Sequence, residues 1–184
     1  AIPDLKRAAS KFRDTLTQNG FEVFVFRFAN RIEPVEDIAA IPETFDDQAG
    51  ERFTSLYAAV MTGFEFSDDA VVVAFSDGAD NYSQNYIQVP NDEGVLDVVE
   101  GYIEPKGHLG EDRKRVVHTI ALGEFEKERD RDGVEAGDAL ERISKNGTVT
   151  NAKNPGALDA VFAKVAERIR SIYIVEFLSP SAGG

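Results

Sequence analysis

The stretch at residues 70–81, AVVVAFSDGADN, constrains most strongly what this chain can fold into. Its first half is an unbroken apolar run that is too short for a typical helix and rich in valine. That pattern is typical of a strand buried on both faces of a parallel sheet. Its second half is polar and contains Asp77, Gly78 and Asp80. Because ligands of open α/β sheets bind at the carboxyl ends of the strands, we expect these carboxylates at the functional edge of the molecule.

Helical and extended patterns alternate along the rest of the chain. The spacing of apolar residues predicts helices at residues 3–17, 51–64, 92–102, 134–145 and 154–171. Further strands are predicted at 21–28, 115–122 and 172–178, with shorter extended pieces at 31–36 and 148–152. Repeated β-α units of this kind predict an α/β fold with a doubly wound, mostly parallel sheet and helices on both faces.

Length and composition indicate a single globular domain. The chain has 184 residues, of which 42% are hydrophobic and 29% are charged, so it can bury a substantial core. No internal repeat or linker divides residues 1–184. We therefore expect one domain, in which residues 82–114 form a long insertion that consists mostly of surface loop.

The charge balance and the absent residue types exclude several classes of function. A net charge of -13, from 20 Lys+Arg and 33 Asp+Glu, argues against a nucleic-acid partner, which requires a basic face. No apolar run is long enough to span a bilayer, so no membrane span is expected in this chain. The absence of cysteine excludes disulfides and thiolate metal sites.

The common catalytic signatures are absent from the sequence. There is no dinucleotide-binding Gly-x-Gly-x-x-Gly, no phosphate-binding Gly-x-x-x-x-Gly-Lys and no Gly-x-Ser-x-Gly of α/β-hydrolases. His118 falls within an apolar strand, which predicts a core residue, and His108 falls within a loop and has no identifiable partner. The charged run at 124–132 is interpreted as a solvated loop or helix face.

Oxygen ligands are the remaining candidates for chemistry. Asp77, Asp80 and Asn81 follow the central strand, and Thr54 with Ser55 stands near the start of the helix predicted at 51–64. Carboxylate, hydroxyl and water oxygens are the ligands that Mg²⁺ prefers. The alternative is that these residues supply only turn chemistry and a helix cap. On these residues alone, the turn-and-cap interpretation is favoured.

Two segments in this order resemble a known family. RFTSLYAAV at 52–60, followed by VVVAFSDGADN at 71–81, is similar to the second and third metal-site segments of von Willebrand factor type A (VWA) domains. Residues 140–144, 151–155, 158–162 and 169–180 also resemble the closing part of bacterial members of the family. The resemblance runs over nearly the whole chain.

The resemblance implies a Rossmann-like sheet with Mg²⁺ or Mn²⁺ at its carboxyl edge, in a metal-ion-dependent adhesion site that a partner's carboxylate often completes. By this match Thr54 contributes its hydroxyl and Asp77 its carboxylate, directly or through water, whereas Asp80 and Asn81 have no clear ligand role. The family's first metal segment, Asp-x-Ser-x-Ser after the central strand, has no counterpart before the first helix. Without it, two ligands are too few for tight Mg²⁺ binding, and the strands at 21–28 and 70–76 lack their shared neighbour.

Three functional hypotheses follow. The leading one is a non-enzymatic module that binds a protein partner through the edge carrying Thr54 and Asp77, with a divalent cation when the first segment is present. The competing one is a Mg²⁺-dependent hydrolase or phosphoryl-transfer enzyme, in which Asp77 holds the metal and Asp80 is the base or nucleophile. The third is a structural relative whose metal site has decayed. The family resemblance slightly favours a location outside the cytoplasm.

Overall fold

The computed structural model describes residues 2–41, 53–67, 70–76, 79–89, 94–104, 115–123, 127–130 and 132–171. Its α-helices are α1 (Ile2–Gln18), α2 (Leu56–Glu65), α3 (Val95–Ile103), α4 (Ala136–Ile143) and α5 (Leu158–Ser171). Short 3₁₀ turns are η1 (Ile38–Ala40), η2 (Ser83–Asn85) and η3 (Pro155–Ala157). The strands are β1 (Phe26–Phe28), β2 (Ile32–Pro34), β3 (Val71–Ser76), β4 (Val116–Leu122) and β5 (Thr148–Ala152). All five predicted helices are present, with ends that differ from the predicted ones by a few residues.

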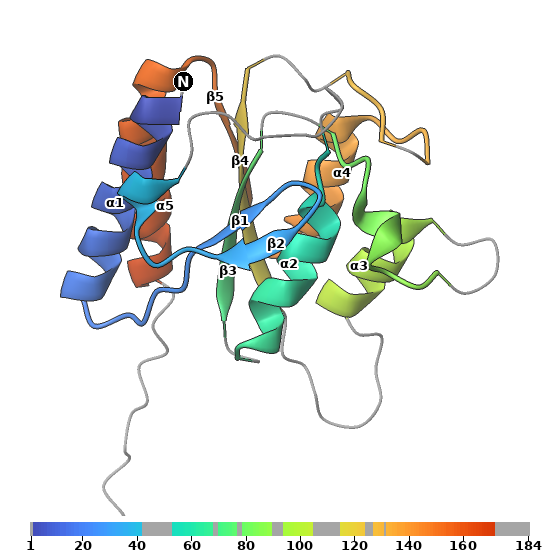
Figure 1. The fold of residues 1–184 in the computed structure, drawn as a ribbon, viewed down its shortest axis with the longest axis horizontal. Helices are drawn as coiled ribbons and strands as arrows, with labels where there is room; N and C mark the ends of the chain where they lie inside the picture. Colours follow the sequence, from blue (N-terminus) through green and yellow to red (C-terminus); the bar gives the residue numbers. More distant parts are fainter. Residues whose placement is uncertain are drawn as a thin grey trace, which may run out of the picture.

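A parallel sheet forms the centre of the molecule. β3, β4 and β5 are hydrogen-bonded in that order, with Val71 opposite Val116 and His118 opposite Thr148. α3 connects β3 to β4, and α4 connects β4 to β5 (Figure 1). Because parallel neighbours require a crossover of this kind, the chain has the predicted α/β organisation.

Helices cover both faces of this sheet (Figure 1). α1 and α5 pack against each other on one face, where Leu16 and Phe162 are buried together with Ile120 of β4. α2, α3 and α4 cover the other face, where Ile143 is buried together with Val117 of β4. Side chains of β4 therefore enter both layers of the core. β3, for which burial on both faces is predicted, also faces both layers, but most of its side chains are only half-buried.

The predicted strand at 21–28 is only partly formed. Its last three residues form β1, which pairs antiparallel with β2 so that Phe28 lies opposite Ile32. In the described part of the chain, β1 and β2 form a sheet of their own, separate from the parallel sheet. Phe21 and Val23 pack against the core of α1 and α5 without joining a strand. The apolar pattern overestimated both the strand and its burial: Phe24 is 56% exposed and the other apolar residues of 21–28 are half-buried, because a strand also requires a hydrogen-bonded neighbour.

The region predicted as a long insertion, 82–114, contains a core helix. α3 buries Leu96, Val99 and Ile103, and it contacts both α2 and α4. Such a helix is needed here because β3 and β4 are parallel and adjacent. The described part of this region is therefore integrated into the fold rather than confined to the surface.

Several predictions concern residues that the structure does not describe. Asp77, His108 and the strand predicted at 172–178 lie outside the described residues. Within the described ranges, no helix combines the length and the apolar character needed to cross a bilayer.

Candidate functional site

Loops that are distant in sequence meet at the N-terminus of α2. Ser55 occupies the N-cap position and is fully buried, but its side chain does not cap the helix. Its hydroxyl instead donates a hydrogen bond to the carbonyl oxygen of Ala29, just after β1, at 2.5 Å. The first-turn N–H groups of α2 donate to Asp80 and Ser83, which follow β3. The start of α2 is thus tied to the carboxyl ends of two strands.

Asp80 is the residue that caps α2. Its Oδ2 accepts a hydrogen bond from the Tyr57 N–H at 2.9 Å and from the Ser83 hydroxyl at 2.5 Å, and its Oδ1 accepts from the Ser83 N–H at 3.1 Å. Ser83 Oγ in turn accepts from the Ala58 N–H at 2.9 Å. Since only 4% of Asp80 is exposed, the turn-and-cap interpretation describes this residue, although the helix it caps precedes it in the sequence.

The protonation of Asp80 reflects two opposing effects. Burial raises the pKa of the Asp80 carboxyl group, because a charged carboxylate loses its hydration. The hydrogen bonds from Ser83 and Tyr57 act in the opposite direction, because they stabilise the charged form. Both oxygens of Asp80 are engaged with the protein, which leaves the residue poorly placed to act as a base or a nucleophile.

Thr54 is held by the same loop. The Thr54 N–H donates a hydrogen bond to Oδ1 of Asn81 at 2.8 Å. The carbonyl oxygen of Thr54 accepts from the N–H groups of Asn81 and Tyr82, at 3.0 and 3.2 Å. Thr54 precedes Ser55 by one residue and is half-buried. The structure therefore brings the predicted ligand Thr54 beside the loop that follows β3.

A second buried carboxylate, Asp130, accepts a hydrogen bond from a side chain of the same helix. Its Oδ2 accepts a hydrogen bond from the Tyr57 hydroxyl at 2.7 Å, and its Oδ1 accepts from the Val134 N–H at 2.8 Å. Asp130 is only 7% exposed. Burial raises the pKa of Tyr57, and the hydrogen bond to Asp130 and its charge raise it further, so the phenol keeps the proton that it donates.

The solvated interpretation of the charged run at 124–132 is therefore wrong for Asp130. This carboxylate is retained in the interior because two polar hydrogens face its oxygens. The signal that sequence reasoning missed is the Gly133 that follows three positions later, at a positive φ of 82°. An aspartate followed by such a glycine is typical of a turn whose side chain bonds its own backbone.

Of the two predicted cation ligands, the structure describes only Thr54. No group of three or more His, Asp or Glu side chains that could hold a metal ion is found among the described residues. The oxygens of Asp80 accept hydrogen bonds from the protein, as does Oδ1 of Asn81. No hydrogen bond joins the Thr54 hydroxyl to another described residue, so this oxygen is compatible with a hard cation. Asp77, the other predicted ligand, lies outside the described residues.

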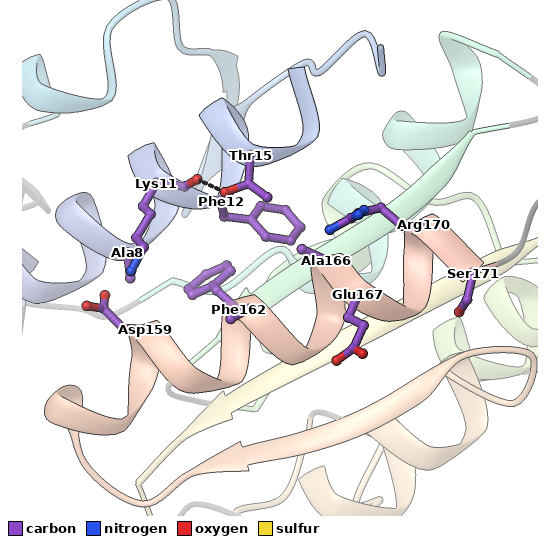
Figure 2. A pocket seen from close by; sticks show the side chains of 11 residues that line it. Ala8, Lys11, Phe12, Thr15, Asp159, Phe162, Ala166, Glu167, Arg170 and Ser171 are labelled. Atoms are coloured by element: carbon purple, nitrogen blue, oxygen red, sulfur yellow. Dashed lines mark hydrogen bonds between the residues drawn. The ribbon is translucent and has the colours of Figure 1, made fainter. Parts of the chain in front are cut away.

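A pocket lies elsewhere, between α1 and α5 on the opposite face of the sheet. It has a volume of about 550 Å³, and Phe12 and Phe162 face each other in it, with ring centroids 5.2 Å apart (Figure 2). Lys11, Asp159 and Glu167 lie around its rim (Figure 2). None of the residues that lines this groove belongs to the loops around Thr54.

His118 is a core residue, as predicted. It is 2% exposed, and its Nδ1 forms a hydrogen bond with Thr148 Oγ1 at 2.9 Å. Its Nε2 is buried and has no hydrogen-bond partner among the described residues. Burial lowers the pKa of His118, and the charge of Arg168 lowers it further. This histidine is therefore a neutral structural residue of β4.

In comparisons with known proteins, no family model, no curated protein and no solved structure matches the chain.

Proposed function

We propose that this chain is a non-enzymatic, protein-binding module of the VWA type, which binds its partner at the carboxyl edge of the sheet through Mg²⁺ or Mn²⁺. The observation that supports this proposal best is the contact between the Thr54 segment and the loop after β3. These are the two segments whose order resembles the VWA metal-site segments. The hydrogen bond from the Thr54 N–H to Asn81, which follows Asp77 in the same loop sequence, supports a common site for the two predicted ligands.

The arrangement of the helices supports a Rossmann-like VWA fold as part of this proposal. α1 and α5 share one face of the parallel sheet, and the antiparallel pair β1 and β2 lies apart from β3. In the proposed fold, β1 and β3 lie on either side of the position of the family's first strand. An Asp-x-Ser-x-Ser after such a strand would complete the coordination of the cation.

The proposed chemistry is ligand exchange at a hard cation. Thr54 would provide a hydroxyl oxygen and Asp77 a carboxylate oxygen, directly or through water. Mg²⁺ keeps several of its water molecules in protein sites, and an acidic side chain of a partner protein can replace one of them. The net charge of -13 favours cation accumulation near the protein, and an acidic partner surface would be repelled without the bound cation.

The test is the effect of Mg²⁺ or Mn²⁺ on the thermal stability of the full-length protein. A cation that binds only the folded state should raise the free energy of unfolding by about 2.7 kcal/mol at a concentration of about 100 Kd. The variants Thr54→Ala and Asp77→Ala should lose this gain. Asp138→Ala removes an exposed carboxylate from the first turn of α4 and should keep it.

Two results would contradict the proposal. If neither cation raises the melting temperature of the wild type, the structural relative with a decayed site is the better description. If the protein hydrolyses a phosphoester and Asp80→Ala abolishes turnover, the enzyme hypothesis replaces the binding module. The engaged oxygens of Asp80 count against the second result.

A further inference from the structure

We propose that the groove between α1 and α5 binds a small apolar molecule that carries one carboxylate group, and that the Arg170 guanidinium group binds this carboxylate. The groove lies on the face of the sheet opposite α2, and all of its lining residues belong to α1 and α5. Binding there requires no metal ion. The proposal therefore goes beyond the proposed function and is tested independently of it.

The groove has the size and the apolar floor of a small-molecule site. Its volume of about 550 Å³ lies within the range of about 300–1,000 Å³ that is typical of ligand pockets. Phe12 of α1 and Phe162 of α5 meet in it with ring centroids 5.2 Å apart (Figure 2). The small side chains of Ala163 and Ala166 also line it. An apolar ligand would be stabilised by removing these ring and methyl surfaces from water.

The two helices form a basic face on an acidic protein. α1 and α5 together contain seven Lys and Arg residues and four Asp and Glu residues, a net charge of +3, whereas the whole chain has a net charge of -13. Lys11 of α1 and Arg170 of α5 line the groove itself. At physiological ionic strength, exposed charges further apart than about 8 Å are largely screened from each other. The local positive charge therefore favours an anionic ligand in this groove.

Arg170 is the cation best placed to bind the anion. Its side chain extends along the groove toward Phe12, whereas the carboxylate of Glu167 points away from that ring (Figure 2). Arg170 is exposed and forms no ion pair with any described residue. Asp159, the other acidic residue of the rim, has the Arg7 guanidinium 3.8 Å away. A guanidinium group can donate two parallel hydrogen bonds to one carboxylate, so Arg170 selects a carboxylate at the end of an apolar ligand.

The experiment is an NMR titration of the ¹⁵N-labelled full chain, in the presence of EDTA, with three probes that share one carbon skeleton. The probe 4-phenylbutyrate carries a carboxylate, 4-phenyl-1-butanol is neutral and 4-phenylbutylamine is cationic. We expect 4-phenylbutyrate to bind with a Kd of about 1 mM, and about 10-fold more tightly than the other two probes. The largest chemical-shift changes should fall on the amides of α1 and α5.

Two variants and a matched control locate the site. Arg170→Gln should weaken the binding of 4-phenylbutyrate about 10-fold, because a charge-assisted hydrogen bond is lost, and should leave the binding of 4-phenyl-1-butanol unchanged. Ala163→Phe places a ring in the groove and should abolish the binding of all three probes. Arg168→Gln removes an exposed arginine of α5 that does not line the groove, and should bind the probes like the wild type. Because all three positions are exposed, the melting temperatures should change by less than about 4 °C.

Four results would overturn the proposal. The first is that 4-phenylbutyrate does not bind the wild type, or binds no more tightly than 4-phenylbutylamine. The second is that Arg170→Gln binds 4-phenylbutyrate like the wild type, and the third is that Arg168→Gln is equally impaired. The fourth is that Ala163→Phe still binds, or that the shift changes lie outside α1 and α5. None of these results affects the stabilisation by Mg²⁺, so this proposal and the proposed function can fail separately.

Discussion

Asp80 and Asp130 are carboxylates buried within an acidic protein, where an unpaired charge would be strongly unfavourable. Each is accommodated because polar hydrogens face both of its oxygens. Tyr57 connects the two, since its N–H bonds Asp80 and its hydroxyl bonds Asp130. At the scale of single residues, the start of α2 is therefore specified by polar contacts, and the burial of these carboxylates indicates a structural role for both.

His118 makes the stability of the protein dependent on pH. Its folded-state pKa lies below the ordinary value of 6.5, so between those two values the unfolded chain binds the proton and the folded protein does not. The stabilising effect is complete above about pH 6.5 and is lost as the pH falls through that value toward the folded-state pKa. We expect the stability of the wild type relative to His118→Gln to fall with acidification, by at most about 1.4 kcal/mol per pH unit.

Urea unfolding of both proteins at a series of pH values measures this difference. The two proteins share all other titrating groups. The test is therefore how the difference between their unfolding free energies changes with pH, and the size of that difference at neutral pH does not affect it. A difference in unfolding free energy that stays constant between about pH 7.5 and pH 5 would contradict the role assigned to His118.

At the scale of elements, helix starts and strand spacing depend on neighbours as well as on local sequence. The helix predicted at 154–171 begins only at Leu158, because Asn154 precedes the short turn η3 instead. The space around two glycines also depends on the neighbouring elements. A Cβ built on Gly147, just before β5, would lie 1.9 Å from the carbonyl oxygen of Val117 in β4. A Cβ on Gly101, in α3, would meet nothing within 4 Å.

Alanine at these two glycines should therefore have opposite effects. Gly147→Ala forces β5 away from the backbone of β4 and should lower the free energy of unfolding by about 3 kcal/mol. Gly101→Ala, at an exposed position of a helix, should raise it by about 0.5–1 kcal/mol, because alanine favours the helix more than glycine does. Equilibrium unfolding in urea measures both changes. Equal and small effects at the two positions would contradict the close approach of β5 to β4.

At the scale of the whole molecule, the parallel sheet separates two apolar layers. Ile143 of α4 lies in the layer with α2 and α3, and Ile169 of α5 lies in the layer with α1. β4 contributes side chains to both layers, so neither can unfold without disturbing the sheet. We expect the two layers to unfold in one cooperative transition although their side chains do not touch across the sheet.

This arrangement predicts additive mutational effects. Ile143→Val and Ile169→Val should each lower the free energy of unfolding by about 1 kcal/mol, and the double variant by about 2 kcal/mol. Urea unfolding followed by circular dichroism and by tyrosine fluorescence should give coincident transitions. A coupling energy above about 0.5 kcal/mol, or two separate transitions, would show that the layers are not independent parts of one cooperative unit.

Local patterns in the sequence predicted the helices and two of the three strands of the parallel sheet, because side-chain periodicity reflects which face of an element is buried. β5 is predicted only as a short extended piece, and residues 21–25 are predicted as strand although they belong to no strand of the structure. The difference lies in pairing: Phe21 and Val23 carry a strand-like pattern, but in the described part of the chain only Phe26–Phe28 of this segment joins a ladder, which no local pattern can reveal.

The candidate site also has features that the sequence predicts and features that only the tertiary structure reveals. The sequence by itself determined that Thr54 precedes a helix and that acidic residues follow a buried strand. Only the tertiary structure decided that Asn81 holds Thr54, that Asp80 caps α2, and that Asp130 is buried beneath Tyr57, 73 residues away in the chain. The physical reason is that the spacing of buried side chains depends only on the helix or strand that carries them. The partners of loop residues depend instead on which strand ends the crossovers bring to the same edge of the sheet.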